Sequence, residues 1–171
     1  MSADGDADLT RTLHRLVTGL LDWLDEIPAD QVDPEAAARI RGSVDWVIAQ
    51  LPAGEQVRLA SGDPDPKSLP VVVGLLVDVV WWLDTCDEDE VDSHLAVKML
   101  EDGLVDLDDL PDAQRDRLVA VLAALAVSEP HDTRRYQLRF FPFGMNLTDD
   151  EPEDDEPTPR DWVSPQARHR E

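Results

Sequence analysis

The densest group of side chains that could do chemistry is an acidic run between residues 84 and 92. Clustered carboxylates can bind a hard cation such as Ca²⁺. A helix–loop–helix calcium loop needs a central glycine and a terminal glutamate, but this run has no glycine, and Leu95 stands twelfth counted from Asp84. We therefore expect a solvated loop between two helices, with Asp92 capping the second. The carboxylates of the run are Asp84, Asp87, Glu88, Asp89, Glu90 and Asp92.

Outside this run, the sequence offers few residues that could support nucleophilic or metal-dependent catalysis. Cys86 is the only cysteine, which excludes an intrachain disulfide, and it lies among acids that favour its thiol over the reactive thiolate. The four histidines form no close pair on a helix, and no glycine-rich phosphate loop or GxSxG motif is present. We predict a non-enzymatic protein with no catalytic, cofactor-binding or metal-binding residue.

Three tryptophans are the better candidates for recognition, because exposed tryptophans are frequent hot spots of protein interfaces. Trp46 and Trp81 lie in helical segments, where burial in the core is the usual alternative. Trp162 lies alone in an acidic tail, where it could be a docking motif or fold back on the body. The predicted partner-binding residues are Trp46, Trp81, Trp162, Asp87, Glu88, Asp89 and Glu90.

A tandem repeat organises the segments that carry these residues. When the sequence is shifted by 59 residues, positions 23–59 align with 82–118 without a gap and with 11 identities. Composition alone would give about two to four. Each copy reads as three helices separated by turns, with apolar residues at spacings of three and four. The nearly continuous apolar run 71–83 could be a buried strand, but the repeat favours a central, fully buried helix.

The predicted fold is all-α: a pseudo-symmetric bundle of two tandem three-helix units, a short C-terminal helix and a disordered acidic tail. The helical body is residues 1–147. It comprises a first unit (8–60), a connector (61–68), a second unit (69–129) and a closing aromatic segment (130–147). The tail, 148–171, holds nine acids and three arginines and lacks apolar periodicity, which predicts disorder.

Net charge limits the kinds of partner. The formal charge of −23 repels phosphate backbones and anionic lipid surfaces, so we expect no direct binding of nucleic acid or membranes. The apolar run is short for a bilayer span, and the first residues lack the features of a signal peptide, so a cytoplasmic location is expected.

The leading hypothesis is an acidic helical interaction module, such as an adaptor, an inhibitor or an immunity or antitoxin-like partner of a basic protein. One alternative is a metal-dependent helical enzyme that uses the carboxylates of residues 84–92. Another is a structural homo-oligomer assembled through the apolar helix. The identity of the partner and the oligomeric state are not encoded in any motif.

Overall fold

The computed structural model describes residues 2–171. Within this range 68% of the chain is helical and no strand is present, which confirms the all-α prediction. The helices are α1 (Ala3–Glu26), α2 (Pro34–Ile48), α3 (Ala53–Ala60), the 3₁₀ turn η1 (Pro66–Ser68), α4 (Leu69–Thr85), α5 (Ser93–Gly103), α6 (Val105–Asp108), α7 (Asp112–Ser128), α8 (Asp132–Gly144) and α9 (Pro165–Arg168).

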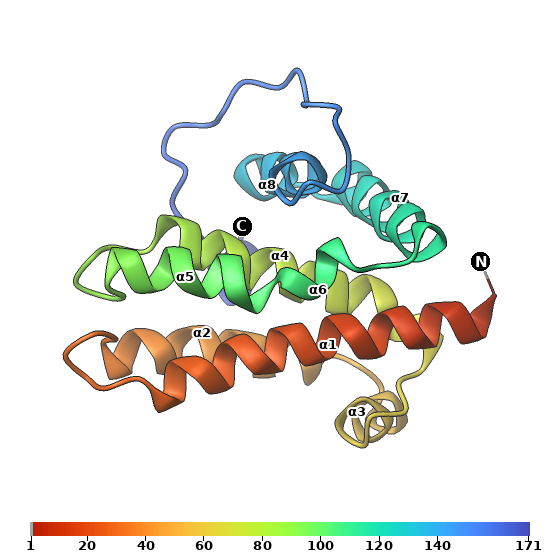
Figure 1. Cartoon of the computed structure of the whole chain (residues 1–171), viewed down its shortest axis with the longest axis horizontal. Coiled ribbons are helices and arrows are strands. Elements are labelled where there is room, and N and C mark those ends of the chain that lie inside the picture. Colours follow the sequence, from red (N-terminus) through yellow and green to blue (C-terminus); the bar gives the residue numbers. More distant parts are fainter. Residues whose placement is uncertain (1) are drawn as a thin grey trace.

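The helices stack in three tiers, with α4 in the middle (Figure 1). One tier is formed by α1 and α2, the next by α4 and α5, and the last by α7 and α8. Helix α4 packs against all five of these neighbours, and its most extensive contact is with α1. This arrangement makes α4 the central core helix that the repeat predicted.

Local sequence explains where the helices begin. The side chain of Asp33 accepts hydrogen bonds from the amides of Glu35 and Ala36 at the start of α2, and Pro34 occupies the first helical position. Asp92 likewise accepts from the Leu95 amide at the start of α5. The cap at Asp92 was predicted from the sequence.

The apolar segment that contains α4 is longer than the sequence suggested. Together with η1 it forms a 20-residue helical stretch, Pro66–Thr85, that is long and apolar enough by length and composition to cross a membrane. Its most apolar window is, however, 78% buried by the rest of the chain. That burial is typical of the core helix of a globular domain.

Several boundaries recur 59 residues apart. Helix α1 ends at Glu26 and α4 at Thr85, α2 begins at Pro34 and α5 at Ser93, and α3 begins at Ala53 and α7 at Asp112. An antiparallel bridge pairs Val32 with Val91. It contains two reciprocal bonds, from the Asp33 amide to the Glu90 carbonyl (2.7 Å) and from the Asp92 amide to the Gln31 carbonyl (2.9 Å).

The second half departs from the first in two places. The helix after Asp92 stops at Gly103, and Leu104 separates it from the single turn of α6. Residues 132–144 form α8, with Pro142 inside its last turn. The rings of Tyr136 and Phe140 stack there at 5.8 Å between centroids.

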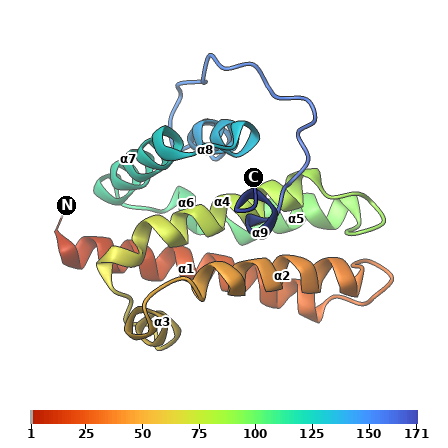
Figure 2. The same cartoon turned by 180° about the vertical axis from the view of Figure 1, so that it is seen from behind.

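The structure does not confirm the prediction that the tail, residues 148–171, is disordered. Residues 149–164 have no regular structure and arch away from the body, and the chain then returns to it as α9 (Figure 2). Pro165 is buried, and Trp162 is half-buried against the core. The residues after 160 thus pack on helices that their composition did not suggest as partners.

Candidate protein-interaction site

The returning residues 160–171, here called the C-terminal segment, lie in a groove of the helical body. This docking groove is formed by Ser43 and Trp46 of α2, Asp78 and Trp81 of α4, and Arg134 of α8. Figure 2 shows α9 above α2 and beside α4. A cavity of roughly 370 Å³ remains between α9, α4 and the α7–α8 corner.

Asp78 is the anchor of the groove. It lies in the apolar helix α4 and is only 3% exposed. Both of its oxygens accept hydrogen bonds from Arg168, Oδ1 from Nη1 at 2.9 Å and Oδ2 from Nη2 at 3.1 Å. Arg134 adds a second cation, with Nη2 3.5 Å from Oδ2. Burial of a carboxylate costs free energy unless the charge is paired with a cation. The ion pairs to Asp78 therefore hold Arg134 and Arg168 against α4.

The ion pairs continue to Glu129, just after α7. Arg134 Nη1 donates to Glu129 Oε2 at 2.5 Å. Burial lowers the pKa of Arg134, but the charge of Asp78 and the bond to Glu129 outweigh it, so that the pKa is raised. Burial raises the pKa of Glu129, but hydrogen bonds from the His131 amide and Arg134 outweigh it, and the pKa is lowered. Both groups are therefore held in their charged forms.

Gly74 makes room for this network. A Cβ atom at position 74 would stand 2.8 Å from Arg134 Nη2, closer than side chains pack. The missing side chain lets the guanidinium of Arg134 lie against α4, one turn before Asp78.

The structure brings the three predicted tryptophans together around the C-terminal segment. Trp81 is buried, its Nε1 donates to the Arg160 carbonyl at 2.8 Å, and the guanidinium carbon of Arg168 lies 5.8 Å from its ring centroid. Trp46 meets the ring of His169 edge to face at 5.8 Å. Trp162 belongs to the segment itself. With the segment docked, Trp81 contacts the segment and is shielded from solvent, whereas Trp46 is partly exposed.

The acidic loop lies beside one end of the groove. Asp87, Glu88 and Asp89 are exposed, and Glu90 pairs with Arg39 of α2. A cavity of roughly 490 Å³ separates the loop from residues 161–167 and is lined by Asp87, Glu90 and Trp162 among others. Glu88 and Asp89 are exposed to solvent beyond this cavity. The other five predicted residues contact the segment or line the cavity, namely Trp46, Trp81, Trp162, Asp87 and Glu90.

Cys86, at the end of α4, lines the same cavity. Burial and then the charge of Glu90 raise the pKa of its thiol to about 11. Its Sγ donates to the Leu83 carbonyl at 3.3 Å. A thiol held protonated in this way is a weak nucleophile. In residues 2–171, no group of three or more His, Cys, Asp or Glu side chains is placed to hold a metal ion.

Sequence reasoning missed the pairing of Asp78 with Arg134 and Arg168. The available signal was a single aspartate inside an otherwise apolar helix, which requires a cationic partner. The chain offers many arginines, and nothing in their spacing selects one in the tail.

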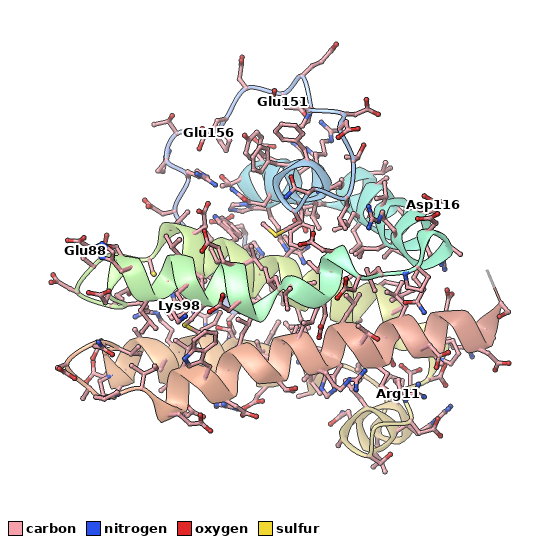
Figure 3. All side chains as sticks on the ribbon, viewed as in Figure 1. Arg11, Glu88, Lys98, Asp116, Glu151 and Glu156 are labelled. Atoms are coloured by element: carbon pink, nitrogen blue, oxygen red, sulfur yellow. The ribbon has the colours of Figure 1, made fainter. Side chains whose placement is uncertain are left out.

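Family models, curated protein sequences and solved structures give no match to this chain. The groove, its occupant and the surrounding charge are therefore the features from which a function is inferred. Figure 3 shows carboxylates on the outer surface of several elements, with Glu88, Asp116, Glu151 and Glu156 labelled.

Proposed function

We propose that this chain is a non-enzymatic interaction module that binds a basic protein, and that the docking groove takes up an arginine-bearing segment of that partner. One observation carries the proposal. The groove already holds such a segment in cis, with Arg168 paired through two hydrogen bonds to the buried Asp78. Planar two-point pairing of arginine with a carboxylate gives both geometric specificity and strength.

The charge of the molecule supports the same partner class. With a net charge of −23, the chain attracts a cationic protein over several ångströms and accelerates their encounter. The acidic loop next to the groove, with Asp87, Glu88 and Asp89 exposed, would meet basic residues that flank the inserted arginine. Such exposed charges are screened by salt, so affinity falls as ionic strength rises.

The C-terminal segment then acts as an internal competitor. Residues 148–159 join it to α8, and we propose that this acidic stretch is a flexible, solvated tether. A tether of this length presents the segment to the groove at an effective concentration on the order of millimolar. A partner must displace the segment, which excludes weak basic competitors and favours a partner with several complementary contacts.

The scaffold of this module is, in our proposal, two three-helix units related by a pseudo-twofold axis. Its support is the recurrence of helix boundaries 59 residues apart and the two reciprocal hydrogen bonds around Val32 and Val91. Because the two copies differ at the groove, where Asp78 and Trp81 correspond to Gly19 and Asp22, only the second copy offers the arginine site.

Affinity capture from the protein's own cells tests the proposal. The tagged full chain is compared with Arg168→Gln, which weakens the internal competitor, and with Arg170→Gln, which removes an exposed arginine of the same segment. We expect one basic protein to be retained in stoichiometric amount at low salt, less at moderate salt, and more by Arg168→Gln than by the other two. Retention that is the same for all three proteins, or unaffected by salt, would refute a role for the groove.

A further inference from the structure

Helix α4 carries two charged side chains, and both are paired with arginines of the C-terminal segment. Asp78, in the middle of the helix, accepts two hydrogen bonds from Arg168. Asp84, in the last turn, is paired with Arg160. The other residues of α4 are uncharged. Both charges of the helix therefore meet the same segment.

Trp81 holds the segment between the two pairs. Its Nε1 donates to the Arg160 carbonyl at 2.8 Å, and the guanidinium carbon of Arg168 lies 5.8 Å from its ring centroid. These contacts fix the spacing of the two arginines, which are eight residues apart. They also fix the direction of the segment. Arg160 meets the C-terminal end of α4 and Arg168 meets its middle, so the segment runs antiparallel to α4.

The first copy of the repeat supports a ligand role for Asp84. Asp84 aligns with Asp25, which pairs with Arg41 of α2 inside the helical body. The residue that aligns with Arg41 in the second copy is Leu100. The second copy thus lacks a body arginine at this place, and the carboxylate of Asp84 is left to a cation that arrives with the docked segment.

The two pairs differ in burial. The side chains of Asp78 and Arg168 are 4% and 10% exposed, whereas those of Asp84 and Arg160 are 43% and 34% exposed. Salt screens exposed pairs strongly and buried pairs much less. The buried pair therefore supplies most of the affinity, and the exposed pair supplies a smaller, salt-dependent contribution that selects the register.

We propose that the docking groove recognises two arginines eight residues apart, on a partner segment that runs antiparallel to α4. The first arginine meets Asp84 and the second meets Asp78. This inference rests on the proposed function, and it specifies which basic segments the groove accepts.

Competition between peptides tests the proposal. A labelled peptide of residues 159–171 is bound to the full-chain double variant Arg160→Gln/Arg168→Gln, in which both cis pairs are removed and whose fold is verified by thermal unfolding. It is displaced by unlabelled peptides of residues 157–171, which omit Glu156, the other acid beside Arg160. Arg160→Gln in the competitor should weaken binding about 1.5- to 5-fold at low salt, the range for an exposed ion pair.

Salt separates the two arginines. In about 1 M NaCl the Debye length is about 3 Å, so the effect of Arg160→Gln should vanish. Arg168→Gln in the competitor should weaken binding at least about 10-fold at low salt, and most of this effect should persist, because the pair with Asp78 is buried.

Two controls make the result specific. Asp84→Asn in the full chain should remove the advantage of Arg160 and leave that of Arg168. A competitor with the reversed sequence keeps the composition and the spacing of the arginines. It should bind about 3-fold more weakly or worse, because it loses the hydrogen bond to Trp81 when both arginines meet their aspartates.

The outcomes distinguish this inference from the proposed function. If Arg168→Gln leaves the affinity of the competitor unchanged, the proposed function itself is wrong. If Arg168 matters but Arg160→Gln has no effect, or has the same effect on the Asp84→Asn chain, the proposed function stands and recognition of two arginines is overturned. Equal affinity of the forward and reversed peptides would overturn the direction of the segment.

Discussion

At the scale of single residues, the buried Asp78 decides whether the C-terminal segment stays on the body. Its carboxylate is satisfied by Arg168 and Arg134, and one of these cations comes from the last residues of the chain. Removing one partner of a buried pair is costly, because the other charge stays buried. The stability of the molecule and the docking of its segment are therefore coupled through one carboxylate.

The first prediction concerns that coupling. Arg168→Gln should destabilise the chain by about 2–3 kcal/mol, since Asp78 keeps only Arg134. Arg170→Gln, at an exposed position two residues later, should stay within about 0.5 kcal/mol of the wild type. Urea unfolding followed by tryptophan fluorescence measures both. Equal midpoints for the two variants would mean that the Asp78–Arg168 pair does not form in solution.

A second prediction concerns acid stability. The pKa of Glu129 is lowered in the folded state from its ordinary value of 4.5, which it regains on unfolding. Its carboxylate thus stabilises the fold above about pH 4.5. That contribution is lost as the pH falls through the lowered folded-state pKa. Glu129→Gln should therefore lose less stability than the wild type on acidification from pH 6, as measured by urea midpoints. Glu153→Gln, which removes an exposed carboxylate of the tail, should follow the wild-type curve.

A third prediction concerns Cys86. With its pKa raised to about 11, the thiol carries about two orders of magnitude less thiolate at pH 8 than an ordinary cysteine of pKa about 8.5. Alkylation by iodoacetamide should be slower than that of glutathione by at least about one order of magnitude, because the greater nucleophilicity of a more basic thiolate offsets only part of this difference and the side chain is also half-buried. Glu90→Gln should accelerate it. A rate equal to that of glutathione would contradict the proposed environment.

At the scale of helices, two glycines with different surroundings provide a fourth prediction. Gly19 lies inside α1 with nothing within 4 Å of a Cβ atom, so Gly19→Ala should stabilise the chain by about 0.5–1 kcal/mol. Gly74→Ala would gain the same helix propensity, but its Cβ must push the Arg134 guanidinium away from Asp78. We expect no net gain there. Thermal unfolding of the two variants is the measurement, and an equal gain would show that Arg134 does not pack on α4.

Helices were also the features that the sequence predicted best. The apolar spacing of α1 and the capping residues Asp33 and Asp92 act locally, so they can be read without a structure. The run 71–83 was ambiguous between strand and helix by propensity, and comparison with its repeat partner resolved it correctly. The break at Leu104 was missed, although the turn-prone pair Asp102-Gly103 stands directly before it and could have indicated the end of the helix.

At the scale of the whole molecule, the C-terminal segment was the feature that composition described least well. Acidity and proline content indicate disorder, but one arginine that meets a buried aspartate 90 residues earlier can tie such a segment down. That pairing is a property of the assembled fold, and no local pattern carries it. Trp46, Trp81 and Trp162 were selected as recognition residues from sequence, while the groove between them became visible only with the helices in place.

The central claim is that the docking groove recognises an arginine-bearing segment. A labelled peptide of residues 159–171 tests it most directly, by fluorescence anisotropy against the full-chain Arg168→Gln variant, whose groove is less firmly occupied. We predict that this peptide binds at least about 10-fold more tightly than the same peptide with glutamine at position 168, since a charged hydrogen-bonded contact is worth about 1.5–3 kcal/mol. It should also bind more weakly to the wild-type chain, whose own segment competes. Equal affinity of the two peptides, or no binding of either, would contradict the account.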